Sequence, residues 1–365
     1  MSRNTALFLA ILFAAPLHAE PLEGFGEPKN EASTAVDINA QGQVAGVVQD
    51  EDYHQHAVLF DRNRLTELGT LGGSDSYTKG INARGDIVGA AQDRDNHWRA
   101  FVRRAGEPMR DLGTLGGSSS FGAAINNAGQ LAGFADTSDG YFHAFVSEDT
   151  GAMRDLGTLG GKISYAAGIN NHGAVAGTAA LADGYRHAFL YQPDGGMRDL
   201  GTLGGRQSGA TAVNDAGLVV GASEMPNRRW HAFVWDGRKM TDLGALIGYG
   251  DSFATAVNGA GHVVGTVKLG EERRTFVYRD GKMTVHPGFY GLYVVNAINN
   301  EELVIGARFI AKRFSAATMR SSQPAVVTHG GQDMLVAIIV VLTTATAAML
   351  YRRRYRGIRL GNLVV

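Results

Sequence analysis

A repeat of about 44 residues runs through most of the chain and strongly limits what it can fold into. Its first mark is an apolar residue followed by Asn, and in six of seven units a Gly stands three residues later. This spacing is typical of a hairpin turn, because the Asn side chain can accept a backbone N–H and Gly adopts the left-handed conformation. The turn asparagines are Asn39, Asn82, Asn126, Asn170, Asn214, Asn258 and Asn299.

Three further marks complete each unit. A short apolar strand containing Gly follows the turn, then His-Ala-Phe or a related triplet, and then Asp-Leu-Gly-Thr-Leu-Gly-Gly, as at 111–117, 155–161 and 199–205. Four short strands per unit are typical of a propeller blade. We therefore expect an all-β, seven-bladed β-propeller over residues 20–320. The alternatives are a sandwich and an open solenoid, but a solenoid would need polar capping repeats, which we do not find.

The last unit lacks a fourth strand of its own. Its hairpin spans 294–307 and a third strand is expected at 316–320, but no further strand pattern follows. The mature N-terminus, at 21–26, resembles the fourth-strand motif of the other units. We expect this segment to complete the seventh blade, since such closure leaves no exposed sheet edge.

The paired His-Ala-Phe and Leu-Gly-Thr-Leu-Gly-Gly motifs resemble those of the HAF-repeat family of extracellular repeat proteins. The resemblance covers about residues 22–320. It implies export and a repeat fold, and it implies no established activity.

Both chain ends carry membrane signals. Residues 1–19 have the layout of a secretory signal peptide, with Arg3, an apolar run and a small residue before Glu20. A linker at 321–333 precedes an uncharged segment at 334–351, which is long enough for a transmembrane helix. The tail at 352–365 is rich in Arg and is expected to be cytoplasmic, so the propeller would face the periplasm or the cell surface. Gly330-Gly331 leaves open a second outcome, in which a sorting protease cuts the tail and releases the protein.

Composition excludes several classes of function. The formal net charge is −1, so no basic surplus favours nucleic acid. Cysteine is absent, which excludes disulfides and thiolate metal sites. We expect no cofactor, no metal and a monomeric protein.

The repeated polar residues are best explained by the fold. His143, His187 and His231 each begin a His-Ala-Phe triplet, one to a unit, so they lie on different blades. We expect the His or Arg at this position to hydrogen-bond the Asp of the same unit, rather than to bind metal or act in catalysis. A Ser six residues before each of the first six turn asparagines is expected to satisfy backbone groups, because the Gly-x-Ser-x-Gly context of a nucleophile is missing.

Departures from the repeat are therefore the candidate functional positions. They concentrate in the last three units, at 225–230, 247–253 and 287–293. If the units follow one another around a ring, these segments share one face. The predicted ligand-binding residues are Arg228, Arg229, Trp230, Phe289, Tyr290 and Tyr293.

These observations favour a non-enzymatic binding module for a glycan, a peptide or another envelope protein. One alternative is a lyase or hydrolase that acts on polysaccharides, which would require paired carboxylates or an acid–base His. The other is a structural coat protein, which would self-assemble without a ligand.

Overall fold

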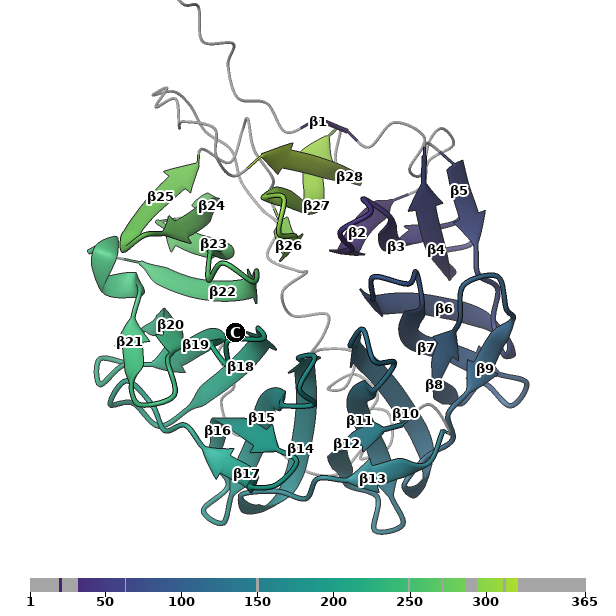
Figure 1. Ribbon diagram of the computed structural model, residues 1–365, viewed down its shortest axis with the longest axis horizontal. Coiled ribbons are helices and arrows are strands. Elements are labelled where there is room, and N and C mark those ends of the chain that lie inside the picture. Colours follow the sequence, from purple (N-terminus) through teal and green to yellow (C-terminus); the bar gives the residue numbers. More distant parts are fainter. Residues whose placement is uncertain are drawn as a thin grey trace, which may run out of the picture. The chain divides into compact units, whose positions relative to one another are not determined.

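The computed structural model describes residues 20–21, 32–62, 64–148, 151–248, 250–270, 272–286, 294–310 and 313–320. All of them belong to one compact unit, Met1–Val327, and a second unit, Thr328–Val365, lies outside the described residues. The described strands form seven four-stranded antiparallel sheets, which are arranged as a ring of blades (Figure 1). The β-propeller with repeated blades is thus confirmed.

Six blades each consist of four consecutive strands. Blade 1 contains β2 (Ser33–Ile38), β3 (Val44–Gln49), β4 (Gln55–Asp61) and β5 (Arg64–Glu67). Blade 2 contains β6 (Gly72–Ile81), β7 (Ile87–Asp93), β8 (Trp98–Arg103) and β9 (Met109–Asp111). Blade 3 contains β10 (Gly116–Ile125), β11 (Leu131–Thr137), β12 (Phe142–Ser147) and β13 (Met153–Asp155).

The next three blades follow the same order. Blade 4 contains β14 (Gly160–Ile169), β15 (Val175–Leu181), β16 (Arg186–Gln192) and β17 (Gly196–Asp199). Blade 5 contains β18 (Ser208–Val213), β19 (Val219–Glu224), β20 (Trp230–Trp235) and β21 (Met240–Asp242). Blade 6 contains β22 (Asp251–Val257), β23 (Val263–Leu269), β24 (Glu272–Arg279) and β25 (Lys282–His286).

The seventh sheet is composite. Blade 7 contains β26 (Val294–Ile298), β27 (Leu303–Ile310) and β28 (Arg313–Arg320), and β1 (Glu20–Pro21) forms its outer edge. Glu20 pairs with Thr318 and Pro21 with Ala317. The closing strand thus comes from the N-terminus, but it is two residues long and begins before the predicted segment 21–26.

The predicted fold class needs correction. It described a seven-bladed propeller, closed by the N-terminal strand, plus a C-terminal transmembrane helix, whereas six complete blades are built from consecutive strands. Within the described residues no helix is long and apolar enough to cross a membrane. The helical element there is η1 (Gly244–Leu246), a single 3₁₀ turn. The predicted signal peptide, linker, transmembrane segment 334–351 and tail lie outside the described residues.

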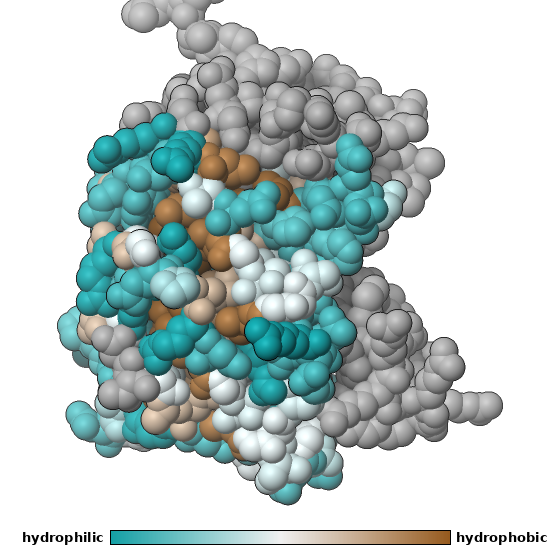
Figure 2. Space-filling view, turned by 90° about the vertical axis from the view of Figure 1, so that its right-hand side faces the viewer, coloured by the Kyte–Doolittle hydropathy of each residue, from teal (hydrophilic) through white to brown (hydrophobic). Residues whose placement is uncertain are grey.

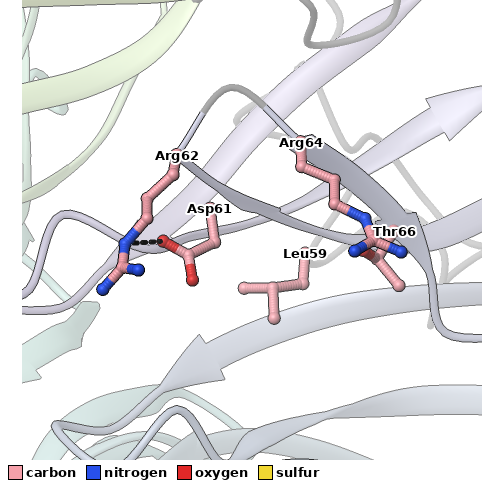
Figure 3. Close-up of a pocket in the computed structure, with 5 residues that line it drawn as sticks. All are labelled: Leu59, Asp61, Arg62, Arg64 and Thr66. Atoms are coloured by element: carbon pink, nitrogen blue, oxygen red, sulfur yellow. Dashed lines mark ion pairs between the residues drawn. The ribbon is translucent and has the colours of Figure 1, made fainter.

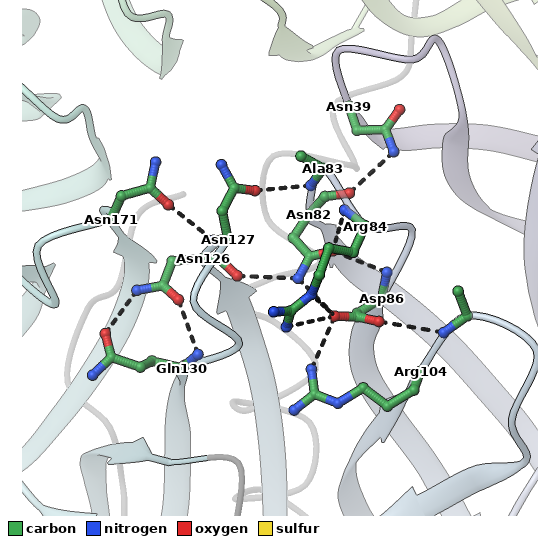
Figure 4. Close-up of polar contacts among 11 residues, drawn as sticks. Asn39, Asn82, Ala83, Arg84, Asp86, Arg104, Asn126, Asn127, Gln130 and Asn171 are labelled. Carbon is green, nitrogen blue, oxygen red and sulfur yellow. Dashed lines mark hydrogen bonds and ion pairs between the residues drawn. The ribbon is translucent and has the colours of Figure 1, made fainter.

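The turn asparagines connect every blade to the next. Each Asn is buried, and its Nδ2 donates to the backbone carbonyl of the Asn in the following blade (Figure 4). The last of these bonds runs from Asn299 to Asn39 over 3.4 Å and joins blade 7 to blade 1. Each Asn Oδ1 also accepts the N–H four residues later, which fixes the turn. The recurrence of this Asn in every unit therefore places one such hydrogen bond at each seam, the boundary between two adjacent blades.

Blade 2 adds a buried charge network to this seam. The Asp86 carboxylate accepts from Asn82 Nδ2 and Arg84 Nε, each at 2.9 Å, and from Arg104 Nη1 at 3.1 Å (Figure 4). Burial alone would raise the pKa of Asp86, but these hydrogen bonds and the Arg104 charge hold it below its usual range.

The second strand of each blade packs against the first at very short range. A Cβ added to Gly177, for example, would overlap the carbonyl oxygen of Tyr165 and press on the Phe189 ring. Equivalent overlaps occur at Gly89, Gly133, Gly221, Gly265 and Gly306. The approaching backbone belongs to the same blade.

Apolar side chains fill the spaces between blades. A fully buried Phe from the third strand recurs in blades 2 to 6, as Phe101, Phe145, Phe189, Phe233 and Phe276. The fourth strands are mostly exposed, and Figure 2 shows hydrophilic residues over much of one flank, with apolar residues visible between them. The core therefore lies between the inner strands of adjacent blades.

Candidate functional site

Two of the three predicted departures from the repeat meet at the boundary of blades 5 and 6. Trp230 is the first residue of β20, and its backbone N–H donates to Asp251 Oδ1 at 3.0 Å. Its indole stacks on Phe253, with ring centroids 6.3 Å apart and planes 23° from parallel. The segments 225–230 and 247–253 are therefore in direct contact at Trp230.

The loop before Trp230 presents two arginines to solvent. The Met225 carbonyl accepts the Arg228 N–H at 2.9 Å, and Asn227 Oδ1 accepts the Arg229 N–H at 3.0 Å. Arg228 adopts the left-handed conformation, with φ of 65°, which closes the turn. Within the described part of the chain, neither guanidinium has a hydrogen-bond or ion-pair partner. Both positive charges are therefore available to a ligand.

The neighbouring loop also differs from the other blades. Where blades 2 to 5 are entered through Gly-Thr-Leu-Gly-Gly, the loop into blade 6 forms η1 and exposes 53% of Leu246. Gly244 lies against His231, so close that a Cβ there would meet the imidazole. The turn thus packs on β20 next to Trp230 and leaves Leu246 exposed. The predicted departure from the repeat began at Ile247, one residue after Leu246.

We call Arg228, Arg229, Trp230, Leu246 and Phe253 the blade 5–6 patch. The other predicted ligand-binding residues, Phe289, Tyr290 and Tyr293, lie outside the described residues.

The repeated histidines act within their own blades. His143, His187 and His231 direct Nδ1 at Asp155, Asp199 and Asp242, at 2.8 to 2.9 Å. These three pairs were predicted. The prediction fails for Arg99, which bonds Asp93 at 3.0 Å rather than Asp111. In blade 1, His56 bonds Asp50, and that hydrogen bond is the main reason why the pKa of Asp50 is lowered.

The repeated serines are confirmed as structural. Ser164 is fully buried, accepts the Ala144 N–H at 2.8 Å and donates to the Gly157 carbonyl. Equivalent bonds hold Ser76, Ser120 and Ser208. A hydroxyl that is committed to two backbone groups in the interior is not placed to attack a substrate.

The aromatic residues that follow these serines pack between blades. Phe121 contacts Trp98 of the preceding blade at 6.3 Å, and Tyr165 contacts Phe134 of the preceding blade at 5.1 Å. Phe121 is only 2% exposed. Phe121 and Tyr165 therefore serve the packing of adjacent blades.

The loop at 93–97 contains three residues of the types that bind metal ions. Ligand atoms of Asp93, Asp95 and His97 lie within 4.8 Å of one another. However, Asp93 Oδ1 already accepts the backbone N–H groups of Asp95 and His97, and Oδ2 accepts from Arg99. The Asp93 carboxylate is therefore occupied in forming the turn, and we assign no metal role to this loop.

A hollow of about 320 Å³ lies on the outer hairpin of blade 1 (Figure 3). It is lined by Leu59, Asp61, Arg62, Arg64 and Thr66. Its one carboxylate, Asp61, accepts from Gln43 Nε2 at 3.1 Å and lies 4.0 Å from Arg62. A single carboxylate already engaged in this way does not supply the acid–base pair of a glycosidase.

The similarities to known proteins support the propeller fold and assign no function. No family model matches the chain, and no curated protein matches its sequence. The β-propeller domain of the Trilobed protease from Pyrococcus furiosus is similar in structure, with a TM-score of 0.57 at 12% identity over 80% of this chain and 96% of that one.

Two further solved structures are also similar. A Mycobacterium tuberculosis puromycin-hydrolysing peptidase matches with a TM-score of 0.56 at 14% identity over 84% of this chain, which spans only 54% of that protein. The BP39L lectin from Burkholderia pseudomallei matches with a TM-score of 0.50 at 9% identity, over 82% of this chain and 98% of that one. At these identities the likeness concerns the propeller alone.

Proposed function

We propose that this protein is an exported, membrane-anchored propeller that acts as a non-enzymatic binding module for an acidic glycan. The observation that supports it most is the pair of exposed arginines beside Trp230, Arg228 and Arg229, whose guanidinium groups have no partner among the described residues. Guanidinium groups bind carboxylates and sulfates in a bidentate manner, and an indole offers a flat apolar surface to a sugar ring. The export signals and the resemblance to HAF-repeat proteins are consistent with a ligand in the cell envelope.

Two rival functions have specific requirements. A polysaccharide-acting enzyme would need two carboxylates facing a cleft, and neither the blade 1 hollow nor the blade 5–6 patch presents such a pair. A structural coat protein would self-assemble and show no ligand response.

The test is titration of the detergent-solubilised full-length protein with oligogalacturonate and, separately, with a neutral maltooligosaccharide of the same length. We expect the acidic oligosaccharide alone to bind. The double substitution Arg228→Ala and Arg229→Ala should weaken that binding about 10- to 100-fold, as expected for the loss of charge-assisted hydrogen bonds.

The matched control is Arg238→Ala. Arg238 is also exposed and also lies in a tight turn of blade 5, but in the loop at the opposite end of β20. Its replacement should leave binding unchanged. Equal weakening by both variants would indicate non-specific charge attraction. Release of new reducing ends from the oligosaccharide would make the protein an enzyme, and concentration-dependent self-assembly without binding would favour the coat protein.

A further inference from the structure

The inner strands of all seven blades share an irregularity. The first strands surround the centre of the ring (Figure 1). Near its C-terminal end each of them has a bulge, where the pairing with the second strand shifts by one residue. The bulge residue stands three positions before the turn asparagine. The seven residues are Val36, Lys79, Ala123, Ala167, Thr211, Thr255 and Asn296.

The three neutral polar bulge residues all have hydrogen-bond partners: Thr255 Oγ1 donates to the Val264 carbonyl of its own blade at 3.2 Å, and the other two reach the inner strand of the next blade. Thr211 Oγ1 donates to the carbonyl of Ala254 in the next blade at 3.0 Å. Asn296 Nδ2 donates to the carbonyl of Ala35 in the next blade at 2.7 Å. These side chains therefore lie along the seams of the inner wall, where a polar group needs a partner.

Lys79 is the one charged residue among the seven. It is partly buried, and its ammonium lies 5.7 Å from the ring centroid of Tyr77, two residues earlier on β6. Among the residues that the structure describes, neither Lys79 Nζ nor the Tyr77 hydroxyl has a hydrogen-bond acceptor, and Lys79 has no ion pair. Burial lowers the pKa of Lys79 to about 8 and raises that of Tyr77, so both groups carry protons that they can donate at neutral pH.

The nearby inner-wall carboxylate does not serve Lys79. Asp37, on the inner strand of blade 1, accepts the backbone N–H of Ile81 with one oxygen and that of Ile38 with the other, each at 2.9 Å. A partly buried ammonium without a counter-ion is unfavourable, because desolvation is not repaid by an ion pair.

A second lysine–tyrosine pair, Lys162 and Tyr141, provides a comparison for Lys79 and Tyr77. Lys162 is an exposed residue of β14; its ammonium lies 4.9 Å from the ring centroid of Tyr141, and its Nζ donates to the Tyr141 hydroxyl at 3.0 Å. The same residue pair thus occurs twice, once on the surface with a partner and once on the inner wall without one.

We propose that Lys79 and Tyr77 form an anion-binding site on the inner wall of blade 2, which takes a carboxylate or phosphate group. The ammonium supplies charge and up to three donors, and the phenol supplies one more. The site is separate from the blade 5–6 patch, so it can be occupied whether or not that patch binds a glycan.

The experiment compares wild type, Lys79→Met and Lys162→Met by thermal shift with inorganic phosphate, succinate or chloride at equal ionic strength. We expect phosphate, succinate or both to raise the melting temperature of the wild type and of Lys162→Met more than chloride does. That extra shift should be lost in Lys79→Met. A response to phosphate alone would assign a phosphate group, and one to succinate alone a carboxylate.

A labelling measurement keeps the proposal testable if Lys79→Met does not fold. The wild-type protein is treated with limiting acetic anhydride, and acetylation at each lysine is measured by mass spectrometry. We expect the anion that stabilises the protein to slow acetylation of Lys79 by about tenfold while Lys162 is unaffected, the change that about 1.4 kcal/mol of binding would give. The proposal would be overturned if the thermal shifts of Lys79→Met and wild type were equal, or if neither phosphate nor succinate stabilised the wild type more than chloride. Equal acetylation of Lys79 with and without the anion would also overturn it.

Discussion

Blade 4 and the boundary of blades 5 and 6 use the same scaffold in opposite ways. In blade 4 every repeated polar group is occupied: Ser164 bonds two backbone groups, His187 bonds Asp199, and Asn170 bonds blade 5. At the boundary, Arg228 and Arg229 have no partner among the described residues and Leu246 is exposed. In blade 4 the residues that follow the repeat therefore stabilise the fold, whereas at the boundary the residues that depart from it expose side chains that can contact a ligand.

The largest expected effect lies in the regular part. Phe189 is fully buried between inner strands, so Phe189→Ala should lower the free energy of unfolding by about 3–5 kcal/mol, through lost burial and a residual cavity. Leu246→Ala, at the exposed 3₁₀ turn, should change it by about 0.5 kcal/mol or less. Chemical denaturation of both variants measures this difference, and similar losses would contradict the distinction between the two regions.

A smaller effect is expected from the close approach of strands within blade 4. Gly177→Ala would drive a methyl group into the Tyr165 carbonyl, and should cost about 1–3 kcal/mol. Gly195→Ala is the matched control in the same blade, because an added Cβ there would meet only Gln192 at an ordinary contact distance of 3.7 Å. If both variants melt like the wild type, the strands can separate more easily than the packing indicates.

The smallest of the three effects concerns Asp37, which replaces the Ala or Gly found at this position in the other blades. Burial raises its pKa from 3.8 to about 6, against the opposing effect of hydrogen bonds from Ile81 and Ile38. Because the folded state holds this proton more tightly than the unfolded state, the stability it contributes is complete below about pH 4 and is lost as pH rises through 6.

Asp37→Asn should therefore stabilise the protein by about 1–2 kcal/mol at pH 8 and make little difference at pH 4. Melting temperatures of the two proteins across this range test the sign. If the variant is less stable than the wild type at pH 8, the ionised Asp37 carboxylate stabilises the folded state, and the presence of Asp at this position of blade 1 does not lower stability.

Much of the fold could be predicted because its signals are local. Asn-x-x-Gly specifies a turn through bonds within five residues, and Asn39 and its equivalents show those bonds. The pairing of His187 with Asp199 was also accessible, since adjacent antiparallel strands bring them together. Arg99 shows the limit. It bonds Asp93, six residues earlier at the end of β7, instead of Asp111, just as His56 bonds Asp50, and sequence spacing cannot separate two partners that are both within reach.

The sequence by itself determined the four-stranded repeat unit, the hairpin turns within it and the positions that depart from the repeat. These features follow from strand alternation and turn chemistry, which are set by residues close together in the chain. Only the tertiary structure decided which residues meet across blades. The bond from Asn299 to Asn39, the stacking of Trp230 on Phe253 and the short closing strand Glu20–Pro21 depend on how far the ring turns at each seam. That rotation arises from packing over all the blades together, and no single segment of the chain encodes it.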